Sequence, residues 1–245
     1  MHGITNSSFR KKCKKAGADI AYSEMIAAEA IIRRIPKTLE MMQFETAERP
    51  IVIQIFGSNP KSMSEAAKII ENEIKPDGID INFGCPVQKA AKQGFGAIQL
   101  NEAKKAARIV GAVARSVKLP VSVKMRLVGK IPKDTIEFIR AVEKAGVAAV
   151  AIHARTQTQK YRGHADWELL HKIKGEFPEL IILGSGDIAT AQDLKDKLGN
   201  LDGVLIGRAA KRDPQIFTKL SASSLLKYFQ RYKVFIEYEK RKLKK

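Results

Sequence analysis

Short apolar runs alternate with amphipathic stretches along most of this 245-residue chain, and this alternation restricts its fold more than any other feature. The runs expected to form strands are 18–22, 51–56, 78–82, 121–125, 148–152, 180–183 and 203–206. Segments with helical spacing fall at 11–15, 27–32, 61–74, 102–117, 135–144, 167–174 and 191–198. Most connections between strands are long enough for right-handed crossovers, so we expect the strands to pair in parallel.

Repeated strand–helix units in a chain of single-domain size predict an α/β fold, namely a TIM-type (β/α)8 barrel. One strand of the set is not visible, and its expected place is before Met1. We therefore expect a barrel that lacks most of its first strand. The predicted division is a barrel over residues 1–217 and a short, basic, helical C-terminal extension over residues 218–245.

The charge balance of the chain indicates a polyanionic partner. Lys and Arg number 44 against 26 Asp and Glu, which gives a formal net charge of +18. A surface rich in ion pairs, as in thermophilic proteins, would raise Glu together with Lys, and the acidic residues here do not keep pace. Nucleic acid is the simplest partner for such an excess of positive charge.

The two cysteines, Cys13 and Cys85, fit neither a disulfide framework nor a zinc-binding spacing, which predicts free thiols in a reducing compartment and no metal site. No signal peptide is visible at the start, and no apolar run reaches membrane-spanning length. The sequence therefore predicts a soluble cytoplasmic protein without a membrane partner. No obligate protein partner is inferred.

Polar residues stand where the predicted strands end, and this is the edge that carries the active site in α/β barrels. They are Glu24, Gln54, Asn82, Lys124, His153, 184–186 (Gly-Ser-Gly), Gly207 and Arg208. Each one taken singly is compatible with a solvated loop. Their recurrence at strand ends favours a functional site.

Cys85 follows the predicted strand 78–82 and begins a basic, glycine-containing loop that carries Lys89 and Lys92. A free cysteine is most often a small buried apolar residue. The position of Cys85 beyond a strand end, next to Pro86 and ahead of two lysines, instead favours a reactive thiol.

Several segments together resemble the tRNA-dihydrouridine synthases, flavin-dependent barrel enzymes that reduce uridine in transfer RNA. The segments are MHGITNSSFR, SEM, QIFGSNP, DINFGCPVQKAAKQGFGA, VKMR, HARTQTQKYRGHADW, GSGDI and IGRAA. The resemblance extends from Met1 to about Phe217, and the cysteine block combined with the HART block makes it specific.

This resemblance implies FMN as the cofactor, NADPH or NADH as the reductant and tRNA as the partner. It implies that Cys85 is the general acid, which protonates C5 of uracil after a hydride reaches C6. The implied cofactor contacts are Met1, Gln54, Lys124, His153, Ser185, Gly186, Gly207 and Arg208. It implies a substrate contact at Asn82, and its motifs favour Lys92 and Arg155 as RNA contacts. Lys89 and Arg126 are further basic candidates for RNA contacts near the mouth.

The chain also departs from the family pattern. No strand ending in proline precedes Met1, Ser185 stands where the family usually has Asn, and the helical RNA-binding domain is reduced to residues 218–245. Two alternatives stay open. One is a flavin barrel of the dihydroorotate or dihydropyrimidine dehydrogenase type, against which the charge of +18 counts. The other is a catalytically weakened barrel that binds RNA, which loading with FMN would exclude.

Overall fold

The computed structural model describes residues 3–85, 94–129 and 131–221. Three residues predicted for the site, Met1, Lys89 and Lys92, lie outside these ranges, and so does most of the extension predicted at 218–245. The domain boundary at residue 217 stays a prediction. No helix in the described part of the chain is both long and apolar enough to cross a bilayer.

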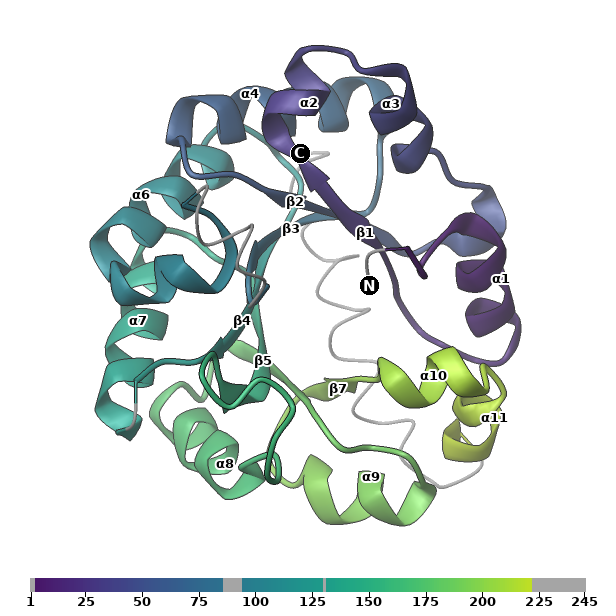
Figure 1. Ribbon diagram of the computed structural model, residues 1–245, viewed down its shortest axis with the longest axis vertical. Coiled ribbons are helices and arrows are strands. Elements are labelled where there is room, and N and C mark those ends of the chain that lie inside the picture. The colour runs from purple at the N-terminus through teal and green to yellow at the C-terminus, as the bar shows by residue number, and fades with distance from the viewer. Residues whose placement is uncertain (1–2, 86–93, 130, 222–245) are drawn as a thin grey trace.

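Seven parallel strands form one sheet in sequence order, curled into a half-barrel with helices around its outside (Figure 1). The strands are β1 (Ala21–Ala27), β2 (Ile51–Phe56), β3 (Gly78–Phe83), β4 (Val121–Leu127), β5 (Ala149–Thr156), β6 (Ile181–Ser185) and β7 (Gly203–Leu205). In the described part of the chain, β1 and β7 are the two edges of the sheet. The predicted α/β barrel class is confirmed.

The helices are α1 (Ser7–Lys15), α2 (Ala28–Ile32), α3 (Pro36–Met42), α4 (Pro60–Ile69), α6 (Ala103–Ala114), α7 (Pro132–Lys144), α8 (Trp167–Glu176), α9 (Ala191–Leu198), α10 (Arg208–Arg212) and α11 (Ile216–Ser221). Short η segments lie at η1 (Thr46–Glu48), η2 (Ile70–Ile74) and η3 (Gly96–Asn101). Side-chain oxygens of Asn59, Asp166 and Thr190 cap α4, α8 and α9 by accepting backbone N–H groups. The helices α3, α10 and α11 were not predicted, because each is too short to show a clear period.

The first strand corrects a boundary. Residues 18–22 were expected to form it, but β1 begins at Ala21, where it first pairs with Ile51 of β2. The preceding residues form the turn out of α1, in which Ala18 N–H donates to the Cys13 carbonyl over 3.0 Å. Glu24 consequently lies within β1 and does not follow its end.

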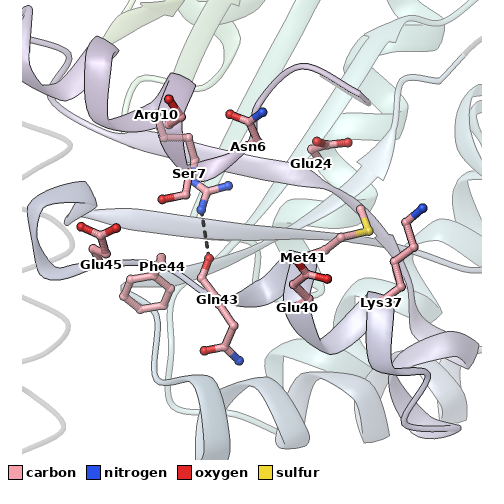
Figure 2. Close-up of a pocket in the computed structure, with 11 residues that line it drawn as sticks. Asn6, Ser7, Arg10, Glu24, Lys37, Glu40, Met41, Gln43, Phe44 and Glu45 are labelled. Atoms are coloured by element: carbon pink, nitrogen blue, oxygen red, sulfur yellow. Dashed lines mark hydrogen bonds between the residues drawn. The ribbon is translucent and has the colours of Figure 1, made fainter.

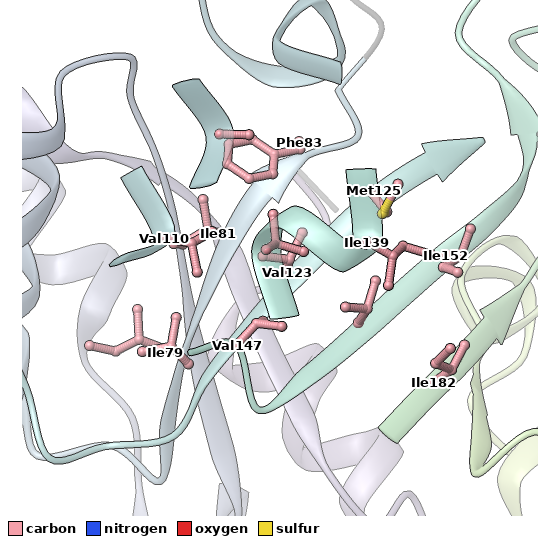
Figure 3. Close-up of a cluster of buried hydrophobic side chains, with 14 of the residues drawn as sticks. Ile79, Ile81, Phe83, Val110, Val123, Met125, Ile139, Val147, Ile152 and Ile182 are labelled. Atoms are coloured by element: carbon pink, nitrogen blue, oxygen red, sulfur yellow. The ribbon is translucent and has the colours of Figure 1, made fainter. Parts of the chain in front are cut away.

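Successive side chains of each strand point to opposite faces, which separates a core face from a polar face. The large apolar residues of β3 to β6 pack outward against the helices, as Ile81, Phe83, Val123 and Ile152 do in Figure 3. The alternate positions of the same strands point into the barrel. The main apolar core therefore lies outside the sheet. The inner face carries polar groups and a smaller apolar cluster, formed by Ala149, Ala151, Ile181 and Leu183.

Candidate active site

A cavity of about 1660 Å³ occupies the inside of the half-barrel and its mouth, and it reaches the two sheet edges β1 and β7. Within the described part of the chain, all the implied catalytic, cofactor and substrate residues except Arg155 line it. They are Gln54, Asn82, Cys85, Lys124, Arg126, His153, Ser185, Gly186, Gly207 and Arg208. The parallel strands thus bring together residues that lie far apart in the sequence.

A chain of hydrogen bonds runs along the inner face of β2 and β3. Asp80 Oδ2 accepts from Gln54 Nε2 over 2.7 Å, and Gln54 Oε1 accepts from Asn82 Nδ2 over 2.9 Å. Asn82 Oδ1 in turn accepts from the backbone N–H groups of Gly84 and Cys85, both over 3.0 Å. These bonds tie the backbone of Cys85 to the inner face of the sheet.

The carbonyl side of Cys85 is held as well. Its oxygen accepts from Ala97 N–H over 3.0 Å. Gly96, at a φ of +73°, lies so close that a Cβ there would approach the Cys85 carbonyl oxygen to 2.8 Å, so glycine is required at this position. Cys85 as a residue is partly exposed and lines the cavity.

The interior holds an acid and a base whose pKa values burial moves toward each other. Burial raises the pKa of Asp80 to about 6, against the opposing hydrogen bonds from Ser122 and Gln54 and the charge of Lys124. Burial also lowers the pKa of Lys124 to about 8, although the charge of Asp80 opposes this shift. Lys124 lines the cavity, and its Nζ donates to the Met125 carbonyl over 3.4 Å.

His153 offers an unused ring nitrogen to the cavity. Its Nε2 is buried without a hydrogen-bond partner among the described residues, while Nδ1 lies 3.4 Å from Ser185 Oγ. Burial is the main cause that lowers the pKa of His153 to about 3, and the charges of Lys124, Arg126 and Arg155 add to it. The imidazole is therefore neutral near neutral pH and can donate to or accept from a bound ligand.

We expect the imidazole of His153 to stay neutral well below its ordinary pKa of about 6.5. Between pH 6.5 and 3, His153 is protonated in the unfolded chain but neutral in the folded protein. The free energy of unfolding should therefore fall as the pH drops from about 6.5 toward 3. Between pH 6.5 and 4 this loss is expected to be roughly 1–3 kcal/mol. NMR titration of the ring nitrogens measures the pKa. An NMR titration midpoint near pH 6 would contradict the lowered pKa of His153. In thermal melts, the stability of His153→Gln should depend less on acid pH than that of wild type.

Arg126 joins two loops of the mouth. Its Nε donates to the Gly84 carbonyl over 3.1 Å, and Nη1 donates to the carbonyls of Thr156 and Lys160 over 3.2 and 2.9 Å. The guanidinium also lies over the Tyr161 ring, 5.5 Å from its centroid. The side chain is 3% exposed, so its predicted contact with RNA stays a prediction.

Asp187, in the loop after β6, forms hydrogen bonds with two arginines, Arg155 and Arg208. It accepts from Arg155 Nη2 over 2.6 Å and from Arg208 Nη2 over 2.8 Å, and Ala165 N–H donates to it over 2.9 Å. Burial acts to raise the pKa of Asp187, but these hydrogen bonds outweigh it and lower the pKa to about 2. Arg155 is 2% exposed in this arrangement, whereas the Arg208 side chain is 54% exposed and stacks on Tyr161. Arg208 is thus the arginine of the pair that can meet an anion.

The loop after β6 needs glycine at its close approach to the site. Gly186 has a φ of +130°, and a Cβ there would lie 2.8 Å from the Ala165 Cβ and 3.3 Å from the His153 ring. Ser185 Oγ donates to the Ile152 carbonyl over 3.3 Å. Gly207 immediately precedes α10.

Three residues of the site were missed by the sequence reasoning: Asp80, Tyr161 and Asp187. Asp80 carried a usable signal, since it lies two positions before Asn82 on the same face of a strand. Tyr161 and Asp187 lie in loops, where no period indicates direction. Their contacts with Arg126, Arg155 and Arg208 could be found only in three dimensions.

A second, smaller cavity of about 520 Å³ lies beside α1 and α3 (Figure 2). Its lining includes Glu24, which was expected at a strand end, but none of the implied catalytic, cofactor or substrate residues. Arg10, its most buried cation, donates to the carbonyls of Thr5 and Gln43 and to the carboxylate of Glu48. In the described part of the chain, no group of three or more His, Cys, Asp or Glu residues is arranged to hold a metal ion.

The curled parallel sheet and the cavity at its mouth define an α/β-barrel protein with its candidate site at the carboxyl ends of the strands. Solved structures of 10–11% identity share this fold. A 2-naphthoyl-CoA reductase complex gives a TM-score of 0.67 and covers 89% of this chain and 47% of that one. TcOYE with pHBA gives 0.63 at 88% and 83% coverage, and Eimeria tenella DHODH with ferulenol gives 0.56 at 83% and 63%.

The chain belongs to the dihydrouridine synthase (Dus) family, whose model matches residues 1–245. The probable tRNA-dihydrouridine synthase of Aquifex aeolicus is 38% identical over 224 residues, which cover 89% of this chain and 69% of that protein. The Mycobacterium tuberculosis relative of the same description is 37% identical over 236 residues, with 91% and 61% coverage. This chain therefore spans about two thirds of the length of the relatives it matches. The family resemblance noted in the sequence is confirmed.

Proposed function

We propose that this protein is a flavin-dependent tRNA-dihydrouridine synthase, which reduces the C5–C6 bond of specific uridines in tRNA. The observation that carries the proposal is the convergence of Cys85, Lys124 and His153 on one cavity, in a chain that the family model matches from end to end. The net charge of +18 supports a polyanionic substrate. Because tRNA is the proposed substrate, the proposed location is the cytoplasm.

The described residues fit FMN. The unpaired Nε2 of His153 and the ammonium of Lys124 supply polar groups for a flavin ring, with Gln54 beside them. The proposed phosphate site comprises Ser185, Gly186, Gly207 and Arg208. Gly186, in the loop after β6, leaves no room for a Cβ, and Arg208, at the start of α10, is half exposed. An anion at that place would be held by a charge-assisted hydrogen bond.

When bound, FMN would supply the hydride for C6 of the uracil ring, having received it from NADPH or NADH. Cys85 holds the proton that goes to C5, because the residue lines the cavity and its backbone is fixed on both sides. Asn82, which fixes that backbone, also lines the cavity beside the substrate's proposed place. A thiol that donates must be protonated, unlike a cysteine nucleophile.

The uridine must leave its stack in the RNA to enter the barrel, at a cost of roughly a few kcal/mol. Contacts between basic groups and the RNA backbone would offset this cost. Direct contacts from Arg126 and Arg155 stay predictions, since the structure commits both guanidinium groups to loops of the mouth. The proposal includes Lys89 and Lys92, which lie outside the described residues.

The function is tested by incubating the protein with FMN, NADPH and unmodified tRNA, followed by mass analysis of the nucleosides. Dihydrouridine is expected, and a parallel reaction with NADH identifies the preferred reductant. Absence of dihydrouridine from a protein loaded with FMN would contradict the proposal. Reduction of a free pyrimidine without tRNA would support a small-molecule enzyme, and tRNA binding without FMN loading would support an RNA-binding barrel.

A further inference from the structure

The side-chain amides of Gln54 and Asn82 are hydrogen-bonded to each other. They lie between a carboxylate that can only accept hydrogen bonds and backbone N–H groups that can only donate them. At one end, the Asp80 carboxylate accepts from Gln54 Nε2 over 2.7 Å. At the other end, the backbone N–H groups of Gly84 and Cys85 donate to Asn82 Oδ1 over 3.0 Å. The amides of Gln54 and Asn82 meet between these ends at 2.9 Å.

Both ends impose the same orientation on the amides. A backbone N–H can only donate, so Asn82 must present its oxygen to it and its NH₂ to Gln54. Gln54 must then present its oxygen to Asn82 and its NH₂ to Asp80, where an ionised carboxylate can only accept. Turning either amide over would place donor against donor or acceptor against acceptor at both of its contacts.

We propose that Asp80 is a positioning residue for Cys85: its carboxylate fixes the orientation of the Gln54 and Asn82 amides, and Asn82 then holds the backbone of Cys85. The role of Cys85 as proton donor rests on the proposed function, but the hydrogen-bonded connection does not. Asp80 acts at a distance and touches neither the thiol nor a ligand in the cavity.

The surroundings of Asp80 favour orientation over stability as its contribution. The residue is fully buried, and its second oxygen accepts from Ser122 Oγ over 2.6 Å. Lys124 is the charged group that acts on it. A buried carboxylate is expensive to keep, and burial raises its pKa to about 6. An apolar side chain of similar size would fill the same volume but could not accept from Gln54.

The test is the rate at which iodoacetamide alkylates Cys85 in the protein without FMN or tRNA, measured by mass spectrometry of its peptide. Cys13 gives little background, since it is 6% exposed and burial raises its pKa to about 11. Asp80→Leu removes the acceptor, so Gln54 and Asn82 lose their fixed orientation and the Cys85 backbone is released. We expect alkylation at least about fivefold faster, because two backbone hydrogen bonds are lost or weakened.

Asp80→Asn is the conservative variant. It can keep an oxygen toward Gln54 and place its NH₂ against Ser122 Oγ, which can accept. We expect alkylation within about twofold of wild type. Asp77→Leu is the matched control, because Asp77 is 3% exposed and accepts Ile51 N–H over 2.8 Å at the other end of the same strand. It should lower the melting temperature and leave Cys85 alkylation of the folded protein unchanged.

Two results would overturn the inference: wild-type alkylation in folded Asp80→Leu, or an equal increase in Asp77→Leu. If Asp80→Leu does not fold, Gln54→Met breaks the connection at its middle and should give the same increase. In the dihydrouridine assay, Asp80→Leu should lower kcat more than it raises KM for tRNA, with recovery in Asp80→Asn. Faster alkylation of Cys85 in Asp80→Leu with an unchanged kcat would show that the positioning of Cys85 by Asp80 does not matter for the reaction. Failure of wild type to form dihydrouridine would leave the alkylation result intact.

Discussion

Cys85→Ala is expected to lower the rate of dihydrouridine formation by about 10²–10⁴-fold, the range typical of a lost general acid. Alanine removes the proton donor for C5 but keeps the backbone contacts with Asn82 and Ala97. Loading with FMN and affinity for tRNA should therefore stay close to wild type. A single-turnover assay with pre-reduced protein, read by mass, isolates the chemical step from cofactor reduction.

Cys13→Ala is the matched control for this variant. Cys13 lies in α1, is 6% exposed and has no part in the proposed proton transfer. Its replacement should change the single-turnover rate by less than about twofold, because it removes only one buried sulfur. If Cys85→Ala reacted within about threefold of wild type, Cys85 would not be the general acid and another donor would have to reach C5.

The largest effect on stability is expected at Arg10, which lies in α1 and lines both cavities. Arg10→Leu should lower the free energy of unfolding by about 3–5 kcal/mol, because it leaves an unpaired charge inside the protein. Arg10 is 4% exposed and its partner Glu48 is 0% exposed. The guanidinium also donates to the Thr5 and Gln43 carbonyls over 2.7 and 3.0 Å, the latter visible in Figure 2. Urea titration of the two proteins measures the difference.

The next residue provides a matched control. Lys11 pairs with Glu45 at the surface, where the two side chains are 40% and 61% exposed. Lys11→Leu should change the free energy of unfolding by no more than about 0.5–1 kcal/mol, since exposed ion pairs contribute little. The double variant Arg10→Leu/Glu48→Leu should recover part of the loss, because both charges are gone. Equal effects of Arg10→Leu and Lys11→Leu would contradict the prediction that the unpaired charge of Glu48 is costly inside the protein.

Much of the secondary structure could be predicted because the signals that specify it are local. β2 (Ile51–Phe56) and α9 (Ala191–Leu198) have the predicted boundaries, since each shows a clear period between turn or capping residues. The first strand was misplaced for a non-local reason. The strand starts at Ala21 because this residue pairs with Ile51 of β2, thirty residues later. The local sequence around Ala21 does not indicate which residue of β2 it pairs with.

The candidate site was predictable as a group but not in its internal contacts. Parallel strands bring their carboxyl ends to one edge of the sheet. The positions of Gln54, Lys124 and His153 near predicted strand ends therefore predict that they line one cavity, as they do. Arg126 and Arg155 were predicted as basic residues near the mouth, and the family motifs favoured Arg155. Charge does not indicate direction, and the structure turns both side chains toward protein carbonyls or carboxylates.

The sequence by itself determined the order of the strands, the polar residues near their carboxyl ends and the family, because periodicity and motif spacing are properties of short segments. Only the tertiary structure decided which polar groups are already paired. Asp80 is bonded to Gln54 across 26 positions and Arg155 to Asp187 across 32, so their partners depend on how distant segments pack. After that pairing, Cys85 and the Arg208 side chain stay partly exposed, and the buried Nε2 of His153 has no hydrogen-bond partner among the described residues.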